Sequence, residues 1–582
     1  MSLAHIGFPA PGWRWFKDRL WDLEHAFQRA RTAGRAQDDV RLRILFILAV
    51  FSFAFLGLAV GAARMALFPS NVRDFGAGGL DGTARAKLVD RNGVLLAADL
   101  PHYGLYLDPR EVWDVPETRR ALKSVLPDLQ DSRLDKVFAS GRRTFIAGGL
   151  SPSEHARVHD LGLPGLLFEP ESKRVYPLGG VAAHVIGISD SGGMGLSGAE
   201  AGLNAAIRDP NSAGHPVPLS IDLRVQAALD SEVGKAAQIF QAKGAVGVVT
   251  NVRTGEILAL TSYPNYDPNQ AGKAPDYALL NRAAGSVYEM GSTFKVFTVA
   301  MALDSGKVNM GTVFNTSQTM NLGSRAIHDH DKVDYNMTVS EVFLKSSNIG
   351  ASRIALQTGG DTMTKYFEAF GLFKAAPVEL RESARPILPR KWNEDTVASA
   401  SFGHAISVSP LALVAGIGSI MNGGNYVPLT LHPIAPGTVM TGRRVVSPQT
   451  SRQMLDLMRL NAVKGTGTHA NIPGLRVGGK TGSAEKALGG HYVRDKLVSS
   501  FAAVFPTDGP LEADRYLVLV MLDEPVGSKE SFGLRTGGWT AAPAAGRVID
   551  RIAPFLKVQR HLDVPGTVVV AQAPDAAAAA ER

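Results

Sequence analysis

The amino-acid sequence predicts an α+β protein with one transmembrane helix near the N-terminus. Three observations predict this fold class. Residues 44–63 form an uncharged apolar run, and β-hairpin patterns occur at 87–109 and 245–263. A helix-rich stretch at 292–460 is followed by further strand patterns. The length of 582 residues suggests about three or four structural units.

Composition excludes several classes of protein. Hydrophobic residues make up 45% of the chain and charged residues 20%, which is typical of globular proteins and not of disordered, collagen-like or multi-span membrane proteins. The formal net charge of +7 is small for this length and gives no reason to expect a nucleic-acid partner. Because the chain has no cysteine, thiol nucleophiles, thiolate zinc sites, iron–sulfur clusters and disulfides are excluded.

The apolar run at 44–63 is long enough to cross a membrane, since helical residues rise about 1.5 Å each and the hydrocarbon core is about 30 Å thick. Because 43 residues precede the run, an uncleaved signal anchor fits better than a cleaved signal peptide. Basic residues are frequent before the run and sparse after it: Arg14, Lys17, Arg19, Arg29, Arg31, Arg35, Arg41 and Arg43 against Arg64 and Arg73. The positive-inside rule therefore predicts a cytoplasmic N-terminus and an extracytoplasmic catalytic region.

Local patterns predict the elements beyond the membrane run. The first hairpin turns at Asn92-Gly93, a strong turn signal, and the second turns at 253–255. Residues 111–165 have an amphipathic helical pattern, and 216–240 resemble a short strand followed by a helix. The stretch 514–525 is apolar on both faces, which is typical of a central buried strand.

Two motifs for cofactor binding are weak in this chain. Residues 474–481 match the phosphate-binding pattern GxxxxGK[ST], but no strand precedes them and no good helix follows, so nucleotide binding is disfavoured. His328 and His330 of the sequence His-Asp-His-Asp could share a strand face and bind a metal ion. No third ligand occurs at a convincing spacing, and a polar loop explains the sequence equally well.

The pattern Ser-x-x-Lys occurs twice, and its context separates the two copies. Ser292 begins a predicted helix, where its backbone N–H and the positive helix end favour a developing oxyanion. Lys295 lies one turn further on the same face and could serve as the base if it is buried. Ser483 and Lys486 lie in a strand-like stretch, where positions i and i+3 point to opposite faces, so this pair is not expected to be catalytic.

Two further short motifs follow Ser292-x-x-Lys295 in the chain. Ser346-Ser347-Asn348 is a Ser-x-Asn motif, and 480–482 is Lys-Thr-Gly. Each motif alone is common by chance, but the order SxxK, SxN, KTG is the signature of penicilloyl serine acyltransferases.

The chain resembles the class B penicillin-binding proteins, and in particular the septal, FtsI-type branch. Residues 85–93 resemble the pedestal motif of that family, with Ala86 in place of the usual Gly, and 289–292 resemble Glu-Pro-Gly-Ser, with Met290 in place of Pro. Residues 402–404 (Phe-Gly-His) occupy the place of a Gly-Tyr-Gly-like stretch. The shorter matches are 174–177, 198–200, 254–256, 264–269 and 281–282.

The resemblance implies a fold and a location. We expect a transpeptidase domain like that of penicillin-binding proteins and serine β-lactamases, carried on an elongated β-rich pedestal in the cell inner membrane, with the catalytic domain in the periplasm. The expected regions are a cytoplasmic head at 1–43, a transmembrane helix at 44–63, a pedestal or dimerisation-type domain at 64–215, a transpeptidase domain at 216–560 and a flexible tail at 561–582.

The resemblance also implies a reaction, D,D-transpeptidation of peptidoglycan stem peptides at the division septum, inhibited by β-lactams. The implied catalytic residues are Ser292 as nucleophile, Lys295 as its base, Ser346 as proton relay, Asn348 and Lys480. The implied substrate-binding residues are Thr481, Gly482 and Ser483, and Lys480, Thr481 and Ser483 would face the terminal carboxylate. No metal or organic cofactor is implied. The implied partners are an FtsW-type membrane glycosyltransferase and other division proteins.

Three alternatives remain open from the sequence. The first is the elongation-specific relative in the same class, against which the Glu-x-Gly-Ser sequence and the long cytoplasmic head argue. The second is a β-lactam sensor or hydrolase, which would lack the pedestal. The third is a catalytically idle scaffold that recruits division proteins, against which the intact Ser292, Lys295 and Asn348 argue.

Overall fold

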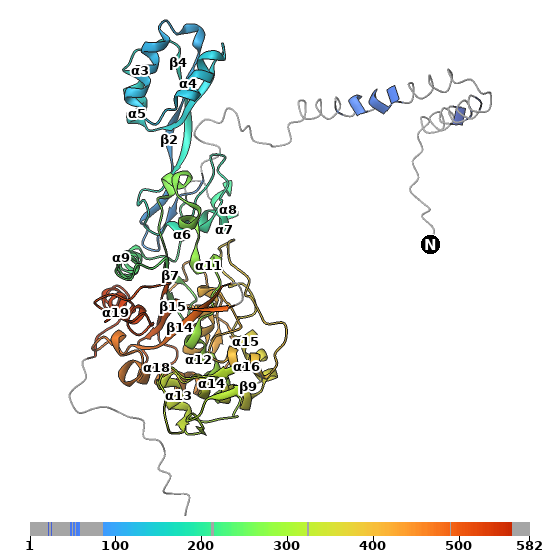
Figure 1. Ribbon diagram of the computed structural model, residues 1–582. Coiled ribbons are helices and arrows are strands. Elements are labelled where there is room, and N and C mark those ends of the chain that lie inside the picture. Colours follow the sequence, from blue (N-terminus) through green and yellow to red (C-terminus); the bar gives the residue numbers. More distant parts are fainter. Residues whose placement is uncertain are drawn as a thin grey trace, which may run out of the picture. The chain divides into compact units, whose positions relative to one another are not determined.

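The computed structural model describes residues 85–210, 215–322, 325–488 and 491–561, together with single residues between 21 and 58 (Figure 1). The chain divides into two units, Met1–Gly79 and Leu80–Arg582. Most of the predicted head and membrane run, and the tail after His561, lie outside the described residues. Within the described residues, no helix has the length and apolar character needed to cross a membrane.

The first sheet is built on the predicted N-terminal hairpin. Its order is β3-β2-β1-β5, and β4 also pairs with β2. The turn between β1 and β2 contains Gly93 with φ +85°, a conformation that glycine adopts at little cost, so the predicted hairpin is confirmed. The strands are β1 (Leu88–Val89), β2 (Leu95–Leu107), β3 (Thr144–Leu150), β4 (Leu166–Val175) and β5 (Val217–Pro218).

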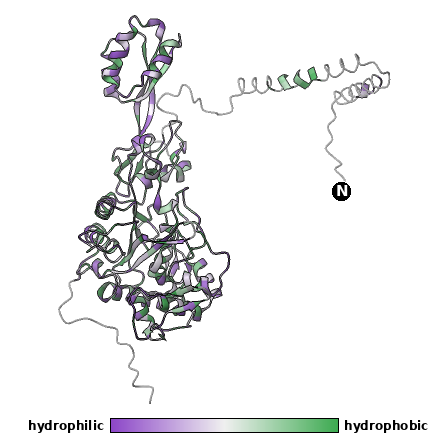
Figure 2. Ribbon diagram, viewed as in Figure 1, coloured by the Kyte–Doolittle hydropathy of each residue, from purple (hydrophilic) through white to green (hydrophobic). Residues whose placement is uncertain are grey.

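Three amphipathic helices cover this sheet: α3 (Val115–Val125), α4 (Asp131–Ala139) and α5 (Pro152–His159). Figure 2 shows hydrophilic and hydrophobic residues alternating along them, and buried Leu122 and Leu134 face strand residue Ile146 in one core cluster. The prediction that all of 111–165 is helical is wrong, because β3 interrupts it. Thr144, Phe145 and Ile146 favour a strand, and β2 supplies the pairing partner.

A buried ion network joins the ends of the first sheet to the glycine-rich segment after it. Glu200 on α7 (Gly198–Gly202) is fully buried and accepts hydrogen bonds from Arg85 Nε (3.0 Å) and Arg174 Nε (2.7 Å). Arg174 also pairs with Asp99 at 3.1 Å. Because burial of an unpaired charge is costly, each member of the network depends on the others.

The second sheet has the order β14-β15-β16-β6-β7, with all pairs antiparallel. Its central strand β16 is almost entirely buried, as the apolar pattern at 514–525 predicts. The predicted hairpin at 245–263 is confirmed as β6 and β7. The bounds are β6 (Gly244–Asn251), β7 (Ile257–Tyr263), β14 (Gly478–Leu488), β15 (His491–Phe505) and β16 (Tyr516–Asp523).

Helices lie on both faces of the second sheet. On one face α9 (Leu223–Ile239) and α19 (Ala541–Ile552) bury alanines and branched residues against β6 and β16. On the other face lies the larger core cluster, which includes α12. The remaining longer helices are α12 (Lys295–Asp304), α13 (Val339–Lys345), α14 (Asn348–Thr358), α15 (Gly360–Ala369), α16 (Glu394–Ala400), α17 (Pro410–Met421) and α18 (Pro448–Lys464).

Shorter elements connect these parts. The short helices are α6 (Ala183–Ile186), α8 (Asn204–Ile207), α10 (Asp276–Leu279) and α11 (Arg282–Gly285). The short strands are β8 (Val313–Phe314), β9 (Met320–Leu322), β10 (Arg325–Ile327), β11 (Met337–Thr338), β12 (Asn425–Tyr426) and β13 (Arg443–Arg444).

The buried network around Glu200 gives a stability prediction. Glu200→Gln should destabilise the protein by about 3–5 kcal/mol, because it leaves Arg85 and Arg174 buried without their shared negative charge. Urea unfolding of the full chain measures the change. The control is Arg119→Gln, which removes the partly exposed ion pairs to Asp131 and Asp135 and should change the midpoint little. Equal midpoints for both variants would show that the network does not stabilise the fold.

Candidate active site

Ser292 lies in a tight turn that is packed against a strand of the second sheet. The 3-10 helix Gly291–Phe294 contains it and leads directly into α12. Gly291 has φ +59°, and a Cβ atom at this position would lie only 3.0 Å from the carbonyl oxygen of Ser483 on β14. The absence of a side chain at Gly291 therefore lets the nucleophile turn approach β14 closely.

Lys295 lies beneath Ser292 and is fully buried. Its Nζ is 2.9 Å from Ser292 Oγ, 2.8 Å from Asn348 Oδ1 and 3.2 Å from Ser346 Oγ. Burial lowers the pKa of the Lys295 ammonium well below its usual range, the charge of Lys480 lowers this pKa further, and the Asp329 carboxylate raises it. A neutral amine in contact with a serine hydroxyl is the arrangement that a serine nucleophile requires.

Lys480 approaches the same centre from β14. It is also fully buried, and its Nζ donates to Ser346 Oγ at 2.9 Å and to the Thr481 carbonyl oxygen at 3.1 Å. Burial lowers the pKa of Lys480 to about 7. The ring of Phe343 lies 5.9 Å from this ammonium and offers a cation–π contact.

Ser346 connects the two lysines. It ends α13 in the left-handed region, with φ +58°, which is unfavourable for a residue that has a side chain. This conformation places Ser346 Oγ within hydrogen-bonding distance of Lys295 and of Lys480. The Ser346 hydroxyl therefore lies between the two amines.

The rest of the Lys-Thr-Gly motif runs along β14. Thr481 Oγ1 is 2.7 Å from Thr466 Oγ1, a partner that sequence analysis did not identify. Gly482 lies so close to β15 that a Cβ atom would be 2.4 Å from Ser500 Oγ. Ser483 Oγ accepts a hydrogen bond from the Gly537 N–H at 3.0 Å. These contacts fix the strand edge beside Ser292.

The second Ser-x-x-Lys pair is separated in space. Lys486 Nζ lies 2.8 Å from Asp523 and 2.9 Å from Glu524, at the end of the neighbouring strands. Ser483 is bonded to Gly537 instead. The structure therefore gives Lys486 a structural ion pair and does not bring it to Ser292.

The structure also shows whether the weak phosphate-binding pattern at 474–481 forms a phosphate-binding loop. Residues 478–481, the end of the GxxxxGK[ST] match, belong to β14 and pair with β15. A phosphate-binding loop needs free backbone N–H groups at a helix start, whereas these residues are part of a paired strand. The nucleotide interpretation is excluded.

Asp329, which sequence analysis treated as part of a metal cluster or a polar loop, caps α14. Its carboxylate accepts hydrogen bonds from Ser347 Oγ and from the backbone N–H groups of Asn348 and Ile349. His328 contributes its carbonyl oxygen to the Asn348 side chain at 3.1 Å. Across the described residues, no three His, Asp or Glu side chains are grouped to hold a metal ion. Asp329 precedes the Ser-x-Asn motif by no characteristic number of residues, so the sequence alone could not have identified it as the cap of α14.

Comparisons with known proteins agree with this geometry. The family model described as penicillin binding protein transpeptidase domain matches residues 245–550, and the model described as penicillin-binding protein dimerisation domain matches 81–192. A "Probable peptidoglycan D,D-transpeptidase FtsI" of Caulobacter vibrioides is 53% identical over 99% of both chains. The chain belongs to the FtsI-type class B penicillin-binding proteins.

Other members of the family are more distant. "Peptidoglycan D,D-transpeptidase FtsI" of Escherichia coli K12 is 30% identical and covers 82% of this chain and 84% of its own. A solved structure of penicillin binding protein 3 from Mycobacterium tuberculosis, complexed with aztreonam, has a TM-score of 0.63 and 24% identity and covers 83% of this chain and 98% of its own. This likeness confirms the transpeptidase fold that the sequence predicts.

The Glu289 carboxylate, just before the Ser292 turn, contacts two other segments of the chain, at 404–405 and at Tyr492. Glu289 accepts a hydrogen bond from the Ala405 N–H at 2.9 Å and from the Tyr492 hydroxyl at 3.2 Å. His404 Nδ1 lies 3.4 Å from the same carboxylate, and the His404 and Tyr492 rings are 5.1 Å apart. The stretch at 402–404, where this chain departs from the family pattern, is thus tied to the segment before the nucleophile.

The lysine environments give a pH prediction. The rate constant for acylation by penicillin should rise with pH, because only the neutral Lys295 amine can accept the Ser292 proton, and the inflection should lie below the range of an ordinary lysine. Asp329→Asn removes the charge that raises the pKa of Lys295, so it should move the inflection to lower pH. Stopped-flow acylation across pH measures this shift.

Asp331→Asn is the matched control for the pH experiment. Asp331 is exposed and pairs with His330 at 3.0 Å, so its loss should leave the inflection where it is. A shift to higher pH in Asp329→Asn, or the same shift in both variants, would contradict the assigned electrostatics.

Proposed function

We propose that the protein is a septal peptidoglycan D,D-transpeptidase that acts through an acyl-enzyme on Ser292 and is inhibited by β-lactams. One observation carries the proposal: Ser292 Oγ lies 2.9 Å from a fully buried amine, in a chain that belongs to the FtsI-type family. The relatives named FtsI support the septal role over the elongation role. The assembled lysine network argues against an idle scaffold.

Acylation follows from the distances. The neutral Lys295 amine takes the proton of Ser292 as Oγ attacks the penultimate D-Ala carbonyl of a donor stem peptide. The backbone N–H groups of Ser292 and Ser483 are the proposed donors to the oxyanion. When the tetrahedral intermediate collapses, the peptide bond breaks and the leaving D-Ala nitrogen receives a proton from Ser346. The protonated Lys295 then returns its proton to Ser346, directly or through Lys480, since both amines contact its Oγ, and is neutral again.

Substrate binding and deacylation use the same groups. Asn348, whose Oδ1 lies 2.8 Å from Lys295, is proposed to hold the amide backbone of the donor. Lys480 and Thr481 are proposed to face the terminal carboxylate, together with Ser483 on β14. An amine of a neighbouring stem peptide then attacks the ester carbonyl and gives a proton to the neutral Lys295. As the tetrahedral intermediate collapses, the ester C–O bond breaks and Lys295 passes this proton to Ser292 Oγ, 2.9 Å away.

Labelling with a fluorescent penicillin tests the assignment of the nucleophile. Ser292→Ala should abolish labelling, because no acyl-enzyme can form. Lys295→Ala should slow labelling by about 10²–10⁴, the usual contribution of a general base. Ser483→Ala should only weaken labelling, because the proposed oxyanion donor is its backbone N–H. Mass spectrometry of the labelled peptide locates the adduct.

Lys486→Ala is the control for that experiment. Its ion pairs lie at the end of β14, so labelling should remain close to that of the unaltered protein. An adduct on Ser483, or any adduct in the Ser292→Ala protein, would overturn the mechanism.

We further propose that residues 44–63 anchor the chain in the inner membrane, with the N-terminus in the cytoplasm and the catalytic domain in the periplasm. The charge asymmetry around the run supports this orientation. Protease added to spheroplasts should therefore degrade everything except the head and the span. Protection of the transpeptidase domain would contradict the proposed topology.

The proposed partners are an FtsW-type membrane glycosyltransferase and other division proteins, which would contact the span and the pedestal. Replacing residues 44–63 by a generic apolar helix should leave penicillin acylation intact but fail to support septation. The readout is cell length in a strain depleted of the native protein. Normal septation with the replaced helix would argue against a specific docking role.

A further inference from the structure

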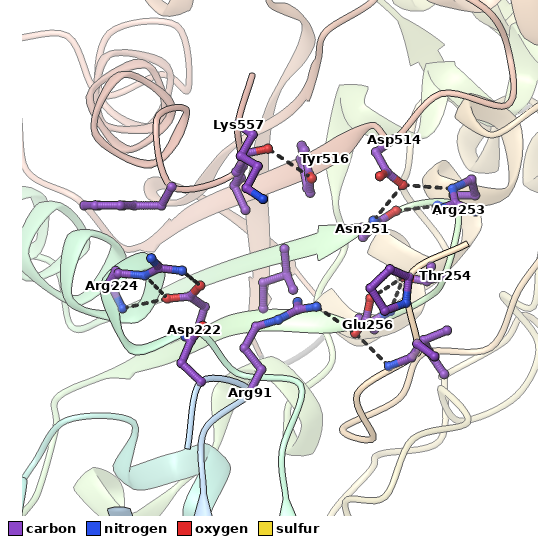
Figure 3. Close-up of a pocket in the computed structure, with 17 residues that line it drawn as sticks. Arg91, Asp222, Arg224, Asn251, Arg253, Thr254, Glu256, Asp514, Tyr516 and Lys557 are labelled. Carbon is purple, nitrogen blue, oxygen red and sulfur yellow. Dashed lines mark hydrogen bonds and ion pairs between the residues drawn. The ribbon is translucent and has the colours of Figure 1, made fainter. Parts of the chain in front are cut away.

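A pocket of about 260 Å³ lies at the junction between the first sheet and the transpeptidase domain (Figure 3). Arg91 and Asn92, in the turn between β1 and β2, form one wall. The start of α9, the turn between β6 and β7 and the segment after α19 form the others. The pocket shares no lining residue with the Ser292 network, so it is separate from the catalytic site.

The two buried carboxylates of this pocket are fully engaged by their neighbours. Asp222 accepts hydrogen bonds from Arg224 Nε at 2.9 Å and from Arg224 Nη2 at 2.6 Å. Glu256 accepts one from Thr254 Oγ1 at 2.8 Å and pairs with Arg91 at 3.3 Å. The side chains of Asp222 and Glu256 are only 5% and 4% exposed, whereas those of Arg224 and Arg91 are 51% and 29% exposed. The accessible charge is therefore mainly that of the guanidinium groups.

The third carboxylate of the pocket, Asp514, also has hydrogen-bond partners within the protein. It accepts hydrogen bonds from Arg253 Nε at 2.8 Å and from the Asn251 side chain at 3.1 Å. The fourth cation, Lys557, is exposed and has no hydrogen-bond or ion-pair partner for its ammonium among the described residues. Four cations and three carboxylates thus line the pocket, and a fourth carboxylate, the buried Asp90, contacts Asn92 and faces Arg224. The charges balance, and the cation without a partner is Lys557.

Unused hydrogen-bond donors lie near the unpartnered ammonium of Lys557. Within the described part of the chain, no hydrogen bond uses Arg224 Nη1 or Arg253 Nη2. The Arg224 guanidinium also lies 5.3 Å from the ring centroid of Phe555, which orients it at the mouth of the pocket. Leu258, Ile434 and Pro436 supply apolar wall between the charged groups.

We propose that this pocket binds a small ligand that presents one carboxylate or phosphate group beside an apolar portion. The unpartnered ammonium of Lys557 matches one negative charge, and the unused guanidinium donors fit the planar or tetrahedral oxygens of such a group. The apolar wall accommodates the uncharged portion. A ligand held by Arg91 on one side and by Lys557 or Arg224 on the other bridges the pedestal turn and the transpeptidase domain.

Calorimetric titration of the full chain in detergent tests this site, with inorganic phosphate and benzoate as separate probes at constant ionic strength. The protein is first acylated with penicillin, so that the catalytic site is blocked. Saturable binding of either probe supports the proposal, and the probe that binds identifies the anion that the pocket accepts. Absence of saturable binding by both probes overturns it.

Variants of Lys557 locate the binding. Lys557→Met should weaken binding about tenfold, as the loss of one charge-assisted hydrogen bond implies, and Lys557→Glu should abolish it. Lys365→Met removes an exposed lysine of α15 and should bind as the unaltered protein does. All three variants should label with penicillin at the unaltered rate, which shows that they are folded. Unchanged affinity in Lys557→Met would place the anion elsewhere and overturn the proposal.

Discussion

The burial of two lysines around one serine hydroxyl is the interaction on which the site depends. Lys295 and Lys480 have no solvent exposure, and each reaches Ser346 Oγ within about 3 Å. Burial lowers the pKa of both lysines, and the charge of Lys480 lowers the pKa of Lys295 further. The Lys295 amine lies 2.9 Å from Ser292 Oγ. Desolvation and the charge of Lys480 thus suit Lys295 to the general-base role proposed for it.

Three segments far apart in the sequence must meet within a few ångströms for this arrangement to exist, and the backbone shows where the approach is tight. A Cβ atom at Gly482 would collide with Ser500 Oγ on β15, and one at Gly291 would press tightly on the Ser483 carbonyl oxygen of β14. Ser346 is held at φ +58°, a conformation that costs about 1–3 kcal/mol for a residue with a side chain. The Asp329 cap of α14 fixes the residues that follow Ser346. Strain at Ser346 is therefore maintained by the cap on one side and by the two amines on the other.

Local sequence patterns predicted the parts of the fold that depend on local physics. The Asn92-Gly93 turn, the apolar strand β16 and the helix after Ser292 each follow from residues that are adjacent in the chain. The order of the three motifs identified Ser292, Lys295, Ser346 and Lys480, which the structure brings together. The features that the sequence did not predict depend on tertiary contacts. Strand β3 formed inside a helical pattern because β2 offered a pairing edge, and the cap by Asp329 has no fixed spacing that a sequence could display. The partners of Lys486 lie on strands that pair only in the folded sheet.

The turn at Asn92-Gly93 also has a role beyond hairpin formation. Asp90, at its start, accepts hydrogen bonds from the Val94 N–H at 2.8 Å and from the Leu223 N–H at 3.2 Å, so one carboxylate fixes both the turn and the beginning of α9. Helix α9 packs on β6 and β7, at the opposite edge of the sheet from β14, which carries Lys480. Between these edges lie β16 and β15, whose buried residues are closely packed and resist small displacements. The pocket and the lysine network therefore contact opposite edges of one sheet, and any coupling between them has to pass through the closely packed strands β16 and β15.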